Sequence, residues 1–373
     1  MAATTPSEIL SVSLQRAIRA GKDSLVGNVA IRQRIEYIAR NPQNRAGLRL
    51  VMACALAVIH RPTVDIRKPY TEIGDADAFS GRSYDEAYLT HFLQEHRLPG
   101  NPTTAFLTPA LRNRNTVLVP GLNLVGRPPE VYQAALQLFD DVRSERITAA
   151  DLLAEMIRWL VLMRDEKEIR MASLLSSLRP TKGHTSLSSE GIVTLVEQHL
   201  RLPRSSRLPV LAVAAAYRAA EIYLGERVID LMGHNAADRQ TGSLGDVEIT
   251  LVDDARVVTS YEMKMKVVAR EDIDIALTKV ANTEIDNYIF ITTEPIDALV
   301  QDYARSLYDR TGIEFVILDC VSFIRYFLHL FHRLRLQFIE EYQTLLLAEP
   351  ESAVSQPLKE AFLSMRLAAE SIE

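Results

Sequence analysis

The chain has 373 residues with a formal net charge of −6 at pH 7, and 47% of its residues are hydrophobic. A chain of this length predicts two domains with sizeable cores, and its mild acidity excludes a protein that is basic throughout, so a nucleic-acid site has to be a local basic patch. The two cysteines lack metal-site spacing and no apolar run reaches the roughly 18 residues of a membrane span, which excludes a zinc module, a disulfide framework and a membrane partner and favours a cytoplasmic location.

The first region of the chain, residues 1–178, combines helical patterns with a long loop-rich stretch. Residues 5–8 form a capping box with proline at the first helical position. Residues 65–128 are rich in Pro, Asn, Gly and Thr, which predicts loops. Helices are expected at residues 8–20, 28–40, 45–60, 129–143 and 148–175.

The rest of the chain predicts a mixed core followed by helices. Residues 178–189 have the composition of a linker, and residues 190–320 alternate helical and strand patterns. Residues 321–373 predict helices that pack on this core or form an oligomer face. Beyond a hairpin near residue 250, we expect helices at 190–200, 208–233, 271–283, 297–311, 321–347 and 357–371 and strands at 287–293 and 313–319. The predicted fold class is α+β, with a helical N-terminal region and a mixed β-sheet core flanked by helices.

The predicted hairpin joins the segments SLGDVEIT, residues 243–250, and SYEMKMK, residues 260–266. Both alternate apolar and polar side chains, as half-buried strands do, and an Asp-Asp-Ala turn lies between them. Matching the apolar faces sets the register, because a slip of one residue sends every side chain to the other face. The predicted pairs are Leu251 with Val257, Ile249 with Thr259, Val247 with Tyr261, and Asp246 with Glu262.

This register brings two acids together on the polar face. Directly opposed side chains have Cβ atoms roughly 4.5–5.5 Å apart, so the carboxylates of Asp246 and Glu262 repel unless a cation lies between them. Mg²⁺ takes oxygen ligands and is often held by one or two carboxylates plus phosphate. Lys264 is on the same face, within reach of a bound water or phosphate. The alternative is an ordinary exposed hairpin face, on which Glu and Lys are common.

Asp246 followed by Glu262-Met263-Lys264 on the next strand resembles the motif of the PD-(D/E)xK nucleases, and the succeeding order of helix, strand, helix and strand is similar to the core of that superfamily. Gly245 stands where Pro is usual. The resemblance implies that Asp246 and Glu262 hold Mg²⁺ together with the carbonyl of Met263, and that Lys264 orients or helps to deprotonate the attacking water and stabilises charge on the phosphate.

The whole layout resembles a type II restriction endonuclease, and the stretch PYTEIG…FSGRSYDEAY…LPGNPTTAFLTPALRN is similar to the SacI-type family. This resemblance implies a homodimer that cuts a short palindrome in double-stranded DNA, because a two-fold protein matches a two-fold site. It also makes GAGCTC the first site to test. Residues 1–178 are then the candidate region for DNA recognition or dimerisation.

Other candidate residues carry weaker signals. In the resembled superfamily a helix before the first catalytic strand often supplies a further acid, and Glu221 matches that position, although a glutamate on a helix is more often only solvated. Arginine and asparagine side chains bind guanine and adenine edges, and lysine and arginine bind phosphates, but polar turns and solvated surfaces use the same residues. The candidate DNA contacts are Arg82, Arg112, Asn113, Arg114, Lys182, Arg204 and Lys266.

Two alternatives to a restriction enzyme stay open. One is another nuclease of the same superfamily, acting in repair or on modified DNA. The other is a DNA-binding or regulatory protein whose acidic face is inert. Strict cutting of unmodified duplex at one sequence distinguishes the first, and Mg²⁺-dependent cleavage distinguishes the second.

Overall fold

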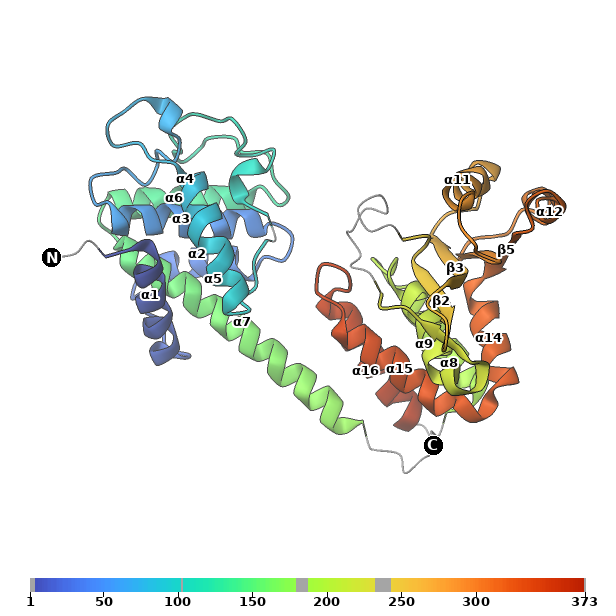
Figure 1. Cartoon of the computed structure of the whole chain (residues 1–373). Coiled ribbons are helices and arrows are strands. Elements are labelled where there is room, and N and C mark those ends of the chain that lie inside the picture. The colour runs from blue at the N-terminus through green and yellow to red at the C-terminus, as the bar shows by residue number, and fades with distance from the viewer. Residues whose placement is uncertain (1–3, 102, 179–186, 232–242, 372–373) are drawn as a thin grey trace. The chain divides into compact units, whose positions relative to one another are not determined.

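The computed structural model describes residues 4–101, 103–178, 187–231 and 243–371. The chain divides into two compact units, residues 1–170 and 171–373, each with its own hydrophobic core (Figure 1). The first is helical and the second contains a five-stranded mixed sheet, so the α+β class predicted from the sequence is confirmed. Within the described residues, no helix is both long and apolar enough to span a membrane.

The first unit is built on five longer helices, and the predicted helices of this region are confirmed. Three of them have side-chain caps at their N-termini: the side chain of Thr5 forms a capping box with Glu8, and the side chains of Asn28 and Asn44 accept backbone N–H bonds. The helices are α1 (Pro6–Ala20), α2 (Val29–Arg40), α3 (Arg45–His60), α6 (Glu130–Arg143) and α7 (Ala149–Ser177).

The described residues between α3 and α6 are mostly in loops, as predicted, and the helical elements among them are short. They are η1 (Thr71–Ile73), α4 (Gly81–Tyr84), η2 (Asp85–Leu89), α5 (Thr90–Glu95) and η3 (Ala105–Leu107). The segment η2 is a π-helix, a rare form in proteins.

The sheet of the second unit has the order β1-β2-β3-β4-β5, in which the first three strands are antiparallel and the last two run parallel to β3. Its strands are β1 (Glu226–Val228), β2 (Val247–Leu251), β3 (Val257–Lys264), β4 (Asn287–Thr292) and β5 (Glu314–Asp319). The hairpin and the two later strands were predicted, but β1 was not. The expected helix 208–233 was too long: α9 (Leu208–Leu224) ends at Gly225, whose φ of 68° is left-handed, and the chain then enters β1.

The predicted hairpin register is confirmed near the site and wrong near the turn. Val247 pairs with Tyr261 and Ile249 with Thr259, as expected. A bulge after Ile249 then pairs Thr250, not Leu251, with Val257. On its other edge β2 pairs regularly with β1, where Leu251 lies opposite Glu226.

The hairpin is also more buried than its alternation indicates, because helices cover both faces of the sheet (Figure 1). One face, which includes Val247 and Tyr261, packs against α8 (Ser189–Leu200), α9 and the C-terminal helices. The other face, which includes Tyr288 and Phe290, packs against α11 (Arg270–Val280) and α12 (Ala298–Ser306). Ser260 of β3 is therefore 0% exposed, although its side chain is polar.

Two predicted helices are interrupted. The expected helix 297–311 is divided into α12 and α13 (Tyr308–Thr311). The expected helix 321–347 is broken at Phe331, whose φ and ψ of −111° and 47° are not helical. Its parts are α14 (Cys320–Leu330), η4 (His332–Leu334) and α15 (Arg335–Ala348), which precede α16 (Gln356–Ser371). The break lets apolar residues of both α14 and α15 pack into the same core.

Candidate active site at the end of the β2–β3 hairpin

The candidate site lies where β2 begins and β3 ends. The N–H of Asp246, just before β2, donates to the Tyr261 carbonyl over 2.7 Å, and Asp246 Oδ2 accepts the Met263 N–H over 2.8 Å. Asp246 is therefore outside the regular ladder and does not directly oppose Glu262 as the register predicted. Its carboxylate instead accepts the N–H of the residue after Glu262, and both acids lie near enough to Lys264 to raise its pKa.

Gly245 allows this close approach. A Cβ atom at this position would lie 2.3 Å from Ser260 Oγ and 2.6 Å from the Tyr261 carbonyl oxygen, both far inside van der Waals contact. Proline, the usual residue in the resembled motif, carries such a Cβ and does not fit this backbone. The departure from the motif therefore has a steric reason in this chain.

A Gly245→Ala protein is expected to lose about tenfold to a hundredfold of any Mg²⁺-dependent DNA cleavage, because a misplacement of about 1 Å at a reacting centre costs that much. The added methyl group pushes Asp246 away from β3. Initial cleavage rates against the wild type measure the effect. Gly27→Ala is the matched control, since a Cβ there meets nothing within 4 Å. Cleavage within about twofold of the wild type would contradict the steric argument.

Two further contacts hold the segment before Asp246. Glu248 Oε1 accepts the Leu244 N–H and the Ser243 hydroxyl. The Tyr288 hydroxyl lies 3.0 Å from the Leu244 carbonyl oxygen and 3.3 Å from Glu262 Oε2. Tyr288 is 1% exposed, so this buried hydroxyl ties the position of Glu262 to the segment that carries Asp246.

Lys264 completes the group. Its Nζ lies 3.0 Å from Glu262 Oε1 and 3.7 Å from Asp272 Oδ1. Burial disfavours its charge, but the carboxylates of Glu262, Asp272 and Asp246 outweigh burial, so the pKa of Lys264 is raised. In this arrangement Lys264 is a cation that is suited to stabilise negative charge.

Asp272 was missed by the sequence analysis. It lies in the first turn of α11, where its Oδ2 accepts the Ala269 N–H and its Oδ1 lies 3.1 Å from Lys266 Nζ. Burial opposes the charge of Asp272, but the Ala269 N–H and the two lysines outweigh it, so the pKa of Asp272 is lowered. An acid in a first helical turn is so common that it gave no signal of a role at the site. Tyr288 was missed because a buried strand tyrosine is usually only a core residue.

The donor set at this site fits Mg²⁺. Among the residues that the structure describes, no group of three or more His, Cys, Asp or Glu side chains is arranged to hold a metal ion. Mg²⁺ needs fewer protein ligands than that, because it keeps several waters and often binds through one or two carboxylates plus phosphate. Asp246 and Glu262 supply two carboxylates, and Met263, whose N–H donates to Asp246 Oδ2, follows Glu262 directly in β3.

Glu221 lies apart from this group. It is on α9, which packs against the face of the sheet that carries Tyr261. Glu262 is the next residue of β3 and points to the opposite face, toward α11. The catalytic role of Glu221 stays a prediction that the observed contacts do not support.

The candidate DNA contacts of the second unit are dispersed. Lys266 is 64% exposed and pairs with Asp272 at the edge of the site. Arg204 is exposed, with a left-handed φ of 64° in the turn between α8 and α9. Lys182 lies outside the described residues. Of the two that the structure describes, Lys266 lies next to the candidate catalytic residues through Asp272.

Three of the candidate DNA contacts in the first unit are exposed, and the fourth is bonded within its own loop. Arg82 is exposed and pairs with Glu86, and Arg112 and Asn113 are exposed. The guanidinium of Arg114 donates to the carbonyls of Ala110 and Asn123, so its contacts stabilise the loop. Contacts of all four with DNA stay predictions.

With this geometry described, the comparison with known families is informative. Residues 185–294 match the SacI restriction endonuclease C-terminal domain. The matched segment runs from α8 to the end of β4 and contains Asp246, Glu262, Lys264 and Asp272. The SacI-type match indicates a restriction endonuclease that cuts DNA. No curated protein matches the chain.

Proposed function

We propose that this protein is a Mg²⁺-dependent type II restriction endonuclease of the PD-(D/E)xK superfamily. It hydrolyses phosphodiester bonds in double-stranded DNA at a short palindromic site. The observation that carries the proposal is the position of Asp246, held against β3 beside Glu262 and Lys264, within the segment that matches the SacI-type domain. An inert acidic surface needs neither the close Gly245 approach nor the buried Tyr288 contact.

In the proposed mechanism, neighbouring side chains bind the metal, orient its ligands and stabilise negative charge. Asp246 and Glu262, with the Met263 carbonyl, would hold Mg²⁺, and the ion would supply Lewis-acid chemistry for phosphodiester hydrolysis. Tyr288 and the Met263 N–H orient the two carboxylates. Lys264 donates hydrogen bonds to the attacking water or to a phosphate oxygen and stabilises the charge that builds up there. The carboxylate of Asp272 contacts Lys266 and lies 3.7 Å from Lys264 Nζ, so it helps to position both ammonium groups.

The proposed active form is a homodimer. Cutting both strands of a palindrome requires two equivalent sites related by the two-fold axis of the DNA. Each protomer then contributes one site of the kind described above. Sedimentation of the protein with and without a cognate duplex measures this expectation.

Incubation of the purified protein with unmodified plasmid DNA tests the function. Discrete fragments are expected in Mg²⁺ and none in EDTA, and sequencing the fragment ends gives the site. Plasmids with and without GAGCTC give the first comparison. A smear would indicate a nonspecific nuclease, cutting of methylated DNA alone would indicate a modification-dependent enzyme, and an absence of cutting on all of them would leave a DNA-binding protein. Each of these three outcomes contradicts the proposal.

A further inference from the structure

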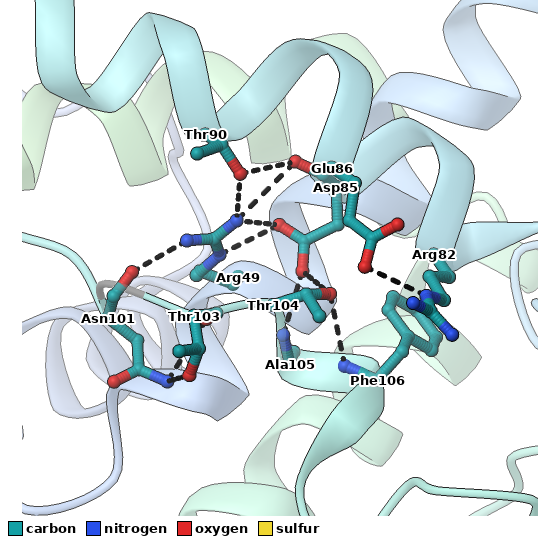
Figure 2. Close-up of polar contacts among 10 residues, drawn as sticks. All are labelled: Arg49, Arg82, Asp85, Glu86, Thr90, Asn101, Thr103, Thr104, Ala105 and Phe106. Carbon is teal, nitrogen blue, oxygen red and sulfur yellow. Dashed lines mark hydrogen bonds and ion pairs between the residues drawn. The ribbon is translucent and has the colours of Figure 1, made fainter. Parts of the chain in front are cut away.

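The first unit contains an ion pair that is almost fully buried. The side chains of Arg49, on α3, and Asp85, at the start of η2, are 1% and 0% exposed. Arg49 Nε donates to Asp85 Oδ1 over 2.7 Å, and Figure 2 shows this pair at the centre of a network. Removing two charges from water costs free energy, and apolar residues in such places are often equally stable or more so.

The pair joins α3 to two later segments, one around η2 and one at the start of η3 (Figure 2). On the arginine side, Nη1 donates to the Asn101 carbonyl over 2.6 Å and Nη2 to the Thr90 hydroxyl over 2.7 Å. On the aspartate side, Oδ2 accepts the Thr104 hydroxyl over 2.6 Å and the Ala105 N–H over 2.8 Å. The network thus holds Asp85 and Thr90, together with the backbone at Asn101 and Ala105 and the hydroxyl of Thr104, in place against Arg49 of α3.

Packing adds to this rigidity. A Cβ atom at Gly81 would lie 2.3 Å from Phe106 Cζ and 2.9 Å from Pro69 Cβ, so α4 rests directly on η3. The π-helical segment Asp85–Leu89 follows at once, and such segments frequently occur at functional sites. Buried contacts therefore fix the inner side of the backbone from Gly81 to Leu89.

The outer side of this backbone presents Arg82 and Glu86. Their side chains are 53% and 44% exposed, and Arg82 Nε lies 2.8 Å from Glu86 Oε1. Arginine donates two hydrogen bonds to O6 and N7 of guanine, and glutamate accepts one from N4 of cytosine. One side chain of each kind, side by side on a rigid support, matches the two edges that a G·C base pair presents in the major groove.

The charge of the first unit agrees with a DNA-facing role. Residues 1–170 contain 22 Lys and Arg against 19 Asp and Glu, a net charge of +3, whereas residues 171–373 contain 20 against 29, a net charge of −9. Phosphate attraction therefore favours the first unit as the part that binds along the duplex.

We propose that Arg82 and Glu86 bind one G·C base pair of the cleavage site, and that Arg49 and Asp85 are positioning residues that hold them at the required place. This inference rests on the proposed function and extends it to sequence selection. The exposed pair exchanges its mutual hydrogen bond for bonds to the two bases, while the buried pair stays intact.

Discrimination between DNA sequences tests the proposed base contacts of Arg82 and Glu86. The kcat/KM of cleavage is measured on the cognate duplex, once its sequence is known, and on duplexes with a single base-pair change at each position. Arg82→Ala and Glu86→Ala are each expected to reduce discrimination about tenfold or more at the same G·C position, and to leave the other positions unchanged. Arg201→Ala, which removes another exposed pair, with Glu197, is the matched control. A uniform loss on every duplex, as from a phosphate contact, or unchanged discrimination would overturn the proposal.

The positioning role of Arg49 and Asp85 is tested with a variant that leaves this buried ion pair intact. Thr104→Val removes one hydrogen bond to Asp85 and is expected to relax discrimination at the position that Glu86→Ala affects. A folded Thr104→Val protein with wild-type discrimination would overturn the positioning role. The proposed function fails if the wild-type protein does not cut DNA in Mg²⁺. If it cuts a defined site and the variants discriminate as the wild type does, this inference alone fails.

Discussion

A Lys264→Ala protein is expected to lose at least about a hundredfold of its Mg²⁺-dependent DNA cleavage, because removing one preorganised charge-stabilising donor typically costs about a hundredfold to a thousandfold. Lys264 is held by Glu262 and Asp272 at the place where Asp246 meets β3, and its raised pKa keeps it charged. The measurement is the single-turnover rate of cutting a duplex that contains the cleavage site. Thermal unfolding of the variant should stay close to that of the wild type, because Lys264 is only partly buried.

Lys266→Ala is the matched control for this prediction. Lys266 is two residues further along, approaches the same Asp272, and is 64% exposed. Its loss is expected to weaken DNA binding modestly and in a salt-dependent way, without a large change in the single-turnover rate. Equal losses of the single-turnover rate in the two variants would contradict a specific catalytic role for Lys264. A near-wild-type rate for Lys264→Ala would refute the assigned mechanism.

An Asp85→Asn protein is expected to lose about 3–5 kcal/mol of the free energy of unfolding of the first unit, which is the cost of leaving a buried charge without its partner. Arg49 is fully enclosed, so no water replaces the lost carboxylate. The amide of asparagine also offers one acceptor oxygen in place of two, and the existing contacts of Asp85 use both.

The single tryptophan of the chain makes this loss measurable in one unit. Trp159 is on α7 and packs against the core of the first unit, so its fluorescence during urea unfolding reports that unit. Glu86→Gln is the neighbouring control: it removes one acid of an exposed pair and is expected to cost less than about 1 kcal/mol. A loss for Asp85→Asn no larger than that of the control would contradict the view that the buried pair determines the local structure.

The local sequence predicted most of the helices and the later strands, because their signals are local. The capping box at Thr5 and the asparagine caps mark where helices begin, and the apolar periods of residues 45–60 and 287–293 determine element type. The errors arose where a tertiary contact overrides a local period. Residues 226–228 look helical but pair with residues 249–251 of β2. Phe331 interrupts a continuous amphipathic pattern, so that α14 and α15 can share one core.

The sequence by itself determined that Glu262 and Lys264 share one face of β3, because the strict two-residue period of a strand limits which side chains can share a face. It predicted Asp246 beside them through a hairpin register that the structure does not keep at that residue. Only the tertiary structure decided how they meet. The close approach at Gly245, the hydroxyl of Tyr288 and the carboxylate of Asp272 depend on elements that are brought to the hairpin from elsewhere in the chain. The contacts of Asp85 with Arg49 and Thr104 also depend on the tertiary structure. Contacts between separate segments produce no periodic pattern in the sequence, so the sequence does not predict them.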